Sequence, residues 1–217
     1  MPLRPDVISG RNLLFLHHPY RMLEKILFIH GLASSGAYKM ASSLRMLLKP
    51  ATVLAPDVPI DPEAALRLLR GVCEEERPDL IVGLSLGGFW AQKLRGFRKI
   101  LVNPDFHVSR LMRTMTGEVE YLSPRADGSR SFMITEDICR GYEALEEDEF
   151  NGIDAAEILL TRAMFADSDE LVHCGPEFEL HYPGRGISYP GKHLPTYPEL
   201  KAYLVPLARE FDCGARL

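Results

Sequence analysis

Ser85 is the side chain best placed to do chemistry, because it stands between Gly83 and Gly87 in the segment Gly-Leu-Ser-Leu-Gly. A short apolar run, residues 80–82, leads into this segment, and a helical pattern, residues 89–94, leads out. A serine at a sharp strand-to-helix turn, with glycines on both sides, can present its hydroxyl to a carbonyl carbon. The pattern predicts a nucleophile, and the plainer alternative is a serine that only caps the helix.

A serine hydroxyl is a poor nucleophile at neutral pH and needs a histidine to accept its proton. We expect His193 to be this base, because it lies in a glycine-containing loop between the last expected strand and the closing helix. Three other histidines follow the serine in the chain and are the alternatives: His107, His173 and His181. His30 precedes the serine, and we expect it to hold its own loop.

The histidine needs an acid to orient it, and two aspartates follow the expected penultimate strand, Asp167 and Asp169. We prefer Asp169, because Asp-Glu-Leu-Val is typical of a loop that leads into a helix, and we keep Asp167 as the alternative acid. The separation of Asp169 from His193 fits one helix and one strand. Asp105, which follows the fourth expected strand, is a third candidate.

Attack on a carbonyl creates an oxyanion, which backbone N–H groups must stabilise. One donor should be the N–H of Leu86, directly after the serine. The other should come from the loop that follows the first strand, where His30-Gly31-Leu32 makes the N–H of Leu32 the natural donor.

These side chains need a rigid scaffold, and the chain predicts one α/β domain over residues 1–217. Apolar runs predict strands, and helical spacing separates them, which is typical of a mostly parallel sheet with helices on both faces. We expect six or seven strands. The expected strands are residues 25–30, 51–55, 80–84, 99–103, 157–165 and 186–189, with 13–16 as a further edge strand, and the expected helices are 38–48, 62–76, 87–94 and 200–211.

Residues 105–156 interrupt this alternation after the fourth strand. The segment mixes apolar residues with five arginines and ends in an acidic run, residues 143–149. We interpret it as a helical insertion over the strand ends, resembling a lid, and the alternative is a helical crossover with a solvated face. The arginines could hold a phosphate or carboxylate of a substrate, or could simply be solvated.

Composition restricts the partners. The chain has 217 residues, a net charge of −5 and a hydrophobic content of 46%, so charge gives no support to a nucleic-acid partner. No apolar run approaches the roughly 18 residues that span a bilayer, and no signal peptide is evident. The four cysteines are scattered, which favours free thiols and a cytoplasmic protein. No metal or cofactor pattern stands out, and the oligomeric state cannot be read.

Several of these segments together resemble the α/β-hydrolase superfamily, and within it the small YqiA-like bacterial esterases. The resemblance rests on Leu27–Ser35, Ile81–Phe89, Leu101–Pro104, Asp169–Val172 and Gly191–His193, and it spans residues 25–208. It implies Ser85, Asp169 and His193 as a catalytic triad, with Leu32 and Leu86 as oxyanion donors. Leu32-Ala33 departs from the aromatic and polar residues that such esterases often carry, and residues 1–24 have no clear counterpart.

The expected function is a serine hydrolase that cleaves a small carboxylic ester or thioester, needs no cofactor and forms an acyl-enzyme on Ser85. A different class of function is a non-catalytic binding protein that keeps the fold. Nucleotide binding by the glycine turn is disfavoured, since Gly83-Leu-Ser-Leu-Gly-Gly matches neither a dinucleotide fingerprint nor a phosphate loop.

Overall fold

The central element of the molecule is a six-stranded parallel sheet in the order β2-β1-β3-β4-β7-β8. The computed structural model describes residues 22–212, so the strand expected at 13–16 lies outside the described residues. The strands are β1 (Lys25–Ile29), β2 (Thr52–Leu54), β3 (Leu80–Leu84), β4 (Lys99–Val102), β7 (Thr161–Ala166) and β8 (Gly186–Tyr189). This is the mostly parallel, doubly covered sheet that the sequence predicts.

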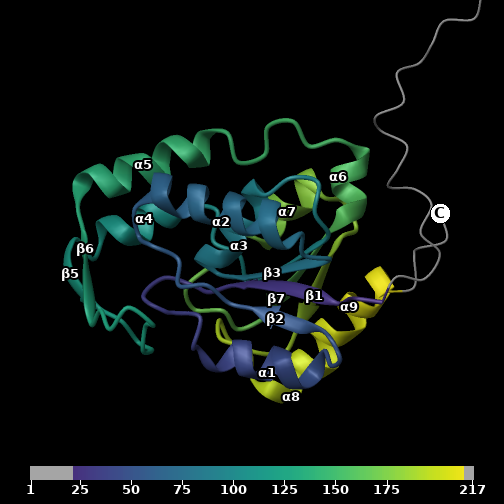
Figure 1. Cartoon of the computed structure of the whole chain (residues 1–217). Helices are drawn as coiled ribbons and strands as arrows, with labels where there is room; N and C mark the ends of the chain where they lie inside the picture. The colour runs from purple at the N-terminus through teal and green to yellow at the C-terminus, as the bar shows by residue number, and fades with distance from the viewer. Residues whose placement is uncertain (1–21, 213–217) are drawn as a thin grey trace, which may run out of the picture.

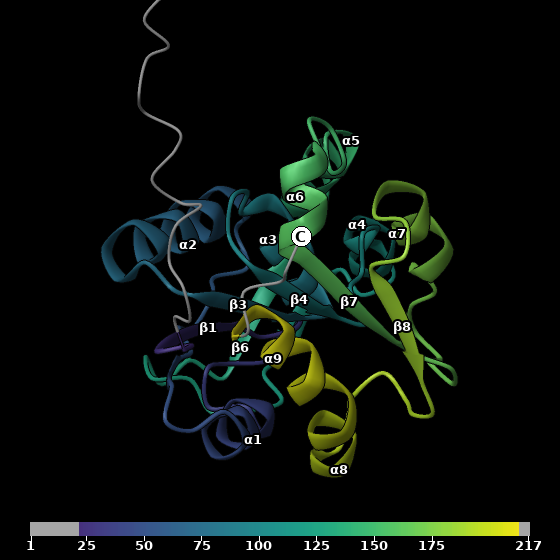
Figure 2. The same cartoon turned by 90° about the vertical axis from the view of Figure 1, so that its right-hand side faces the viewer.

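Helices cover both faces of this sheet (Figures 1 and 2). One layer holds α2 (Pro62–Glu76), α3 (Leu86–Lys93), α4 (Val108–Arg113), α5 (Glu136–Glu147), α6 (Ala155–Leu160) and α7 (Gly175–His181). The other layer holds α1 (Lys39–Leu47), α8 (Tyr197–Glu199), the π-helical turn η1 (Leu200–Leu204) and α9 (Val205–Asp212). Strand side chains alternate between the two resulting cores, which explains why the strands are continuous apolar runs.

Most predicted boundaries hold to within one residue, and two elements differ more from the prediction. The strand predicted over residues 157–165 begins only at Thr161, because Asp154 caps a short helix, α6, by accepting the N–H of Glu157 at 2.8 Å. The closing helix predicted over 200–211 starts with a π-helical turn. Pro206 lacks an N–H, so this region cannot keep a regular α-helical ladder.

The sequence predicts a helical insertion over residues 105–156, but the segment also contains two strands. Between α4 and α5 it forms an antiparallel hairpin of β5 (Gly117–Glu120) and β6 (Ser131–Ile134), separate from the main sheet. We call residues 117–134 the insertion hairpin. Figure 1 shows it at one end of the molecule, beside α4 and α5.

Within residues 22–212, no helix is both long and apolar enough to cross a membrane.

Candidate active site

Ser85 lies at the turn between β3 and α3, with a backbone φ of +54°. Such a φ is uncommon for a residue with a side chain and costs free energy. The turn is possible because glycines let the elements approach closely. A Cβ on Gly83 would lie 2.1 Å from the carbonyl oxygen of Gly87, and a Cβ on Gly87 would lie 2.0 Å from that of Ile29. The sharp strand-to-helix turn predicted from the sequence is therefore present as a strained, tightly packed turn, which we call the elbow.

The hydroxyl of Ser85 does not cap helix α3, although Ser85 occupies the cap position. The side chain is partly exposed, and within residues 22–212 its hydroxyl makes no hydrogen bond. The alternative that Ser85 serves only as a helix cap thus loses its physical basis. The hydroxyl also makes no hydrogen bond to His193 in the described part of the chain; such contacts often tighten only when a substrate binds.

His193 and Asp169 lie together. Nδ1 of His193 donates to Oδ2 of Asp169 at 2.8 Å, and the two side chains are 12% and 3% exposed. The other oxygen of Asp169 accepts the backbone N–H groups of Leu171 at 2.8 Å and Val172 at 3.0 Å. The carboxylate is thereby fixed at three points. Because the carboxylate can only accept, Nδ1 carries the proton and Nε2 of His193 is left free to act as a base.

The other two candidate acids are placed differently. Asp167 is exposed, and its carboxylate makes no hydrogen bond within the described residues. Asp105 is 7% exposed, and its Oδ1 accepts the N–H of His107 at 2.9 Å. Burial raises the pKa of Asp105, while the nearby His107 and His193 lower it. Asp169 alone among the three candidates holds the imidazole of His193.

The expected oxyanion donors have no competing acceptor: within residues 22–212, the N–H groups of Leu32 and Leu86 make no hydrogen bond. Leu86 follows Ser85 directly, and Gly31, which precedes Leu32, packs against Ser85. A Cβ on Gly31 would lie 3.4 Å from Cβ of Ser85 and 4.0 Å from its hydroxyl oxygen. Both N–H groups therefore flank the serine and are available to a ligand.

His30 holds the loop that carries Leu32. The N–H of Val58 donates to Nε2 of His30 at 3.0 Å, so Nδ1 must carry the proton, and it donates to the carbonyl of Gly31 at 2.9 Å. Burial lowers the pKa of His30, which keeps the imidazole neutral and this bonding pattern intact. The three alternative histidines do not contact Asp169 in the described part of the chain: His107 pairs with Glu177, His181 stacks on Phe150, and His173 is exposed.

The insertion hairpin is fastened to the same loop. The N–H of Leu122 donates to the carbonyl of Ala33 at 2.7 Å, and the hydroxyl of Ser35 donates to the carbonyl of Pro124 at 2.6 Å. Asp57 joins the two segments from the side, since its carboxylate accepts the N–H of Gly36 and of Ala126, each at 2.7 Å. Sequence reasoning missed these contacts, because they join residues far apart in the chain.

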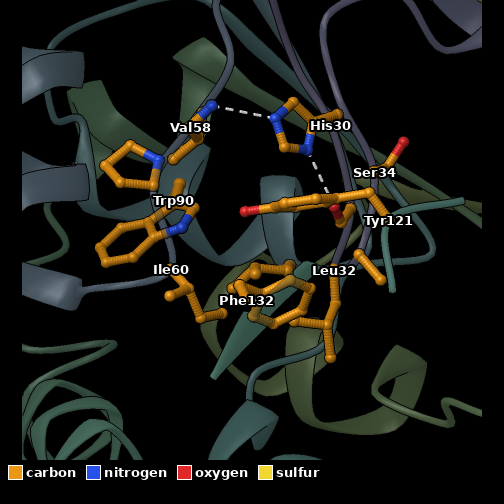
Figure 3. A pocket seen from close by; sticks show the side chains of 12 residues that line it. His30, Leu32, Ser34, Val58, Ile60, Trp90, Tyr121 and Phe132 are labelled. Carbon is orange, nitrogen blue, oxygen red and sulfur yellow. Dashed lines mark hydrogen bonds between the residues drawn. The ribbon is translucent and has the colours of Figure 1, made fainter. Parts of the chain in front are cut away.

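A cavity of about 20 Å³ lies beside the proposed oxyanion donors. It is lined by the loop from His30 to Ser34, by Val58–Ile60, by Leu86 and Trp90, and by Tyr121 and Phe132 of the insertion hairpin. Figure 3 shows Tyr121 and Phe132 pointing into the same space as Leu32 and Trp90. Their ring centroids are 4.7 Å apart. Two aromatic side chains of the hairpin thus line a cavity that also contacts Leu86, the residue after the serine.

Neither a metal site nor a disulfide emerges from the described residues. In that part of the chain, no group of three or more His, Cys, Asp or Glu side chains is arranged to hold a metal ion. Cys73, Cys139 and Cys174 are buried free thiols.

Known structures with this fold include a monoacylglycerol lipase from Paleococcus ferrophilus, with a TM-score of 0.61, 12% identity, and coverage of 88% of this chain and 95% of the other. Est1E from Butyrivibrio proteoclasticus gives a TM-score of 0.60 at 16% identity, covering 87% and 86%. FphF, a fluorophosphonate-binding serine hydrolase of Staphylococcus aureus, gives 0.52 at 16% identity, covering 96% and 89%. At such identities the likeness establishes the α/β-hydrolase fold.

Sequence comparison identifies the family. Comparison with curated proteins gives no significant match. The model of the Uncharacterised protein family UPF0227 matches residues 25–159, which hold the turn at Ser85, the loop after β1 and the whole insertion. The chain is therefore a member of the UPF0227 family, built on the α/β-hydrolase fold.

Proposed function

We propose that the protein is a serine hydrolase that cleaves a carboxylic ester or thioester through an acyl-enzyme on Ser85. The observation that carries the proposal is the buried hydrogen bond between Asp169 and His193, at the same sheet edge as a strained serine whose hydroxyl caps nothing. The likeness to a monoacylglycerol lipase and a fluorophosphonate-binding serine hydrolase supports ester chemistry.

The proposed reaction has two halves. Oγ of Ser85 attacks the carbonyl carbon while Nε2 of His193 takes the hydroxyl proton, and Asp169 stabilises the imidazolium that forms. The N–H groups of Leu32 and Leu86 bind the oxyanion. Collapse of the tetrahedral intermediate expels the alcohol or thiol, which takes the proton from His193. Water, deprotonated by His193, then attacks the acyl-enzyme and releases the acid and Ser85.

A fluorophosphonate probe tests this proposal without knowledge of the substrate. We expect the probe to label the protein once, at Ser85, as located by peptide mass spectrometry. Ser85→Ala should abolish labelling, whereas Ser188→Ala, which removes an exposed hydroxyl in β8, should leave it unchanged. A folded protein that the probe does not label would instead favour the non-catalytic binding protein, for which the missing Ser85–His193 hydrogen bond is the supporting observation.

The small cavity beside the proposed oxyanion donors predicts a preference for short acyl groups. The cavity has space of about 20 Å³, roughly one water molecule, and it opens to solvent, so an acyl chain longer than acetyl has to press against the hairpin aromatics or leave the cavity. We expect kcat/KM for p-nitrophenyl esters to fall from acetate to hexanoate. Phe132→Ala should raise the hexanoate-to-acetate ratio by about tenfold or more, since each methylene in an apolar pocket contributes about 1–3 kcal/mol.

Met133→Ala is the matched control for this substitution. Met133 is the next residue of β6 and is 52% exposed, so its side chain points away from the cavity. Its truncation should leave the ratio unchanged. Equal ratios for the wild type and Phe132→Ala would show that the acyl group lies elsewhere. Acetyl-CoA, measured beside p-nitrophenyl acetate, distinguishes a thioesterase from an esterase.

The net charge of −5 favours a small substrate rather than a nucleic acid, and the buried free thiols of Cys73, Cys139 and Cys174, the cysteines within residues 22–212, favour a reducing compartment. We therefore propose a cytoplasmic enzyme without a nucleic-acid partner.

A further inference from the structure

Asn103, which directly follows β4, has a backbone conformation that is unusual for a residue with a side chain. Its φ is +43°, although the next residue is Pro104, which disfavours helical conformations in the residue before it. The side chain is 1% exposed. Asparagine tolerates the left-handed region better than most residues, but the conformation still costs free energy. Nothing in the proposed reaction uses Asn103, so this strain calls for a different role.

The side-chain amide of Asn103 joins the two segments that carry Asp169 and His193. Its Oδ1 accepts the N–H of Ala166 at 2.8 Å, at the end of β7 and three residues before Asp169. Its Nδ2 donates to the carbonyl of His193 at 2.7 Å and to the hydroxyl of Tyr189 at 2.9 Å, with the carbonyl of Lys192 at 3.4 Å. These partners fix the orientation of the amide, since the carbonyls can only accept and the N–H can only donate.

The backbone beside Asn103 is joined to the elbow as well. The N–H of Ser85 donates to the carbonyl of Val102 at 3.0 Å, and the N–H of Asp105 donates to the carbonyl of Ser85 at 3.3 Å. One short segment, residues 102–105, therefore contacts the nucleophile turn, the acid turn and the histidine loop. Asn103 is its only side chain that bonds the histidine loop among the described residues.

We propose that Asn103 is a positioning residue, which sets the loop of His193 so that Nε2 faces Ser85 while Nδ1 stays on Asp169. This inference rests on the proposed serine hydrolase function. The loop of residues 190–196 belongs to no helix or strand, so its position depends on such contacts. A displacement of about 1 Å in a catalytic group can cost about 10²-fold in rate, which sets the size of the expected effect.

The test variant is Asn103→Gly, because glycine adopts a φ of +43° without strain and only the amide is lost. We expect the maximal rate of fluorophosphonate labelling at Ser85 to fall about 10²-fold, while the probe concentration for half-maximal rate stays within twofold. Hydrolysis of p-nitrophenyl acetate should lose kcat by the same factor, with KM little changed. A purely structural amide would lower the melting temperature without this division between kcat and KM.

Gln92→Ala is the matched control. Gln92 is a fully buried amide on α3 that exchanges hydrogen bonds of 2.6 and 2.8 Å with the hydroxyl of Tyr182, away from the loop of His193. Its loss should lower the melting temperature and leave the labelling rate within twofold of the wild type. If the probe labels the Asn103→Gly protein at the wild-type rate, the inference is overturned.

A second variant, Asn103→Asp, covers the case in which Asn103→Gly does not fold. Aspartate keeps the shape, the tolerance of positive φ and the oxygen for Ala166. It replaces the NH₂ donor to His193, Tyr189 and Lys192 with an acceptor oxygen and adds a negative charge at this buried position. It should also label about 10²-fold more slowly, and labelling at the wild-type rate would again overturn the inference. If the wild type itself is not labelled, the proposed function fails instead, so the two failures are distinguishable.

Discussion

Asp169→Asn is expected to lower kcat for p-nitrophenyl acetate about 10⁴-fold. The carboxylate accepts from Nδ1 of His193 at 2.8 Å, whereas an amide can turn its NH₂ toward the ring and stabilise the opposite tautomer. In that tautomer Nε2 carries the proton and cannot accept one from Ser85. Steady-state kinetics measure the loss, and circular dichroism verifies that the variant is folded.

Asp167→Asn is the matched control, two residues away in the same turn. Its carboxylate is exposed and makes no hydrogen bond within residues 22–212, so kcat should stay within twofold of the wild type. The same measurement on Asp105→Asn completes the comparison of the three candidate acids. A large loss in Asp105→Asn or Asp167→Asn with an active Asp169→Asn would reassign the acid.

Gly87→Ala should destabilise the fold by at least about 3 kcal/mol or prevent folding. The new Cβ would lie 2.0 Å from the carbonyl oxygen of Ile29 and 2.8 Å from that of His30, both backbone atoms of a central strand end. Helix α3 would have to move away from β1, and the elbow would open. Urea unfolding followed by fluorescence of Trp90, the chain's one tryptophan, measures the free energy of unfolding.

Gly71→Ala controls for the chemistry of the substitution. Gly71 lies in the interior of α2, is exposed, and a Cβ there would meet no atom within 4 Å. Alanine is about 1 kcal/mol more favourable than glycine inside a helix, so this variant should be more stable than the wild type. The two substitutions should have opposite signs. A Gly87→Ala protein as stable as the wild type would show that the turn has room to adjust.

The sheet could be predicted from the sequence because its strands are short apolar runs between strong helix signals. For α2, Asp61 caps the first turn and Pro62 follows it, so both the pattern and the boundary are local information. Strand β7 was harder, since the apolar run before it reads equally well as strand or helix. Only the cap at Asp154 indicates that residues 155–160 form a helix rather than a strand.

The insertion hairpin escaped prediction for a different reason. Each of its strands has four residues, and ten residues separate them, so the turn signal of a tight hairpin is absent. The alternation of Glu118, Val119 and Glu120 was the available signal, because period-two alternation indicates a half-buried strand.

In the candidate site, the order of serine, acid and base along the chain pointed to Asp169 and His193, and these two side chains are hydrogen bonded in the structure. The supporting contacts could not be read in the same way. Asn103 forms hydrogen bonds with Ala166 and His193, which lie 63 and 90 positions further along the chain. Its left-handed backbone conformation is set by tertiary packing. The Asn-Pro pair after an apolar strand was the one visible sign.

Two neighbouring residues of the insertion hairpin make separate contacts. Tyr121 lines the cavity, and the N–H of Leu122 donates to the carbonyl of Ala33, next to the proposed oxyanion donor Leu32. A movement of the hairpin backbone that widens the cavity would also break this hydrogen bond to the loop after β1. Under the proposed function, admission of substrate and assembly of the oxyanion donors would then be linked equilibria, and an acyl group that fits under Tyr121 would favour the assembled state. A poorly fitting acyl group would be penalised in kcat as well as in binding, so selectivity would be exerted on the chemical step itself.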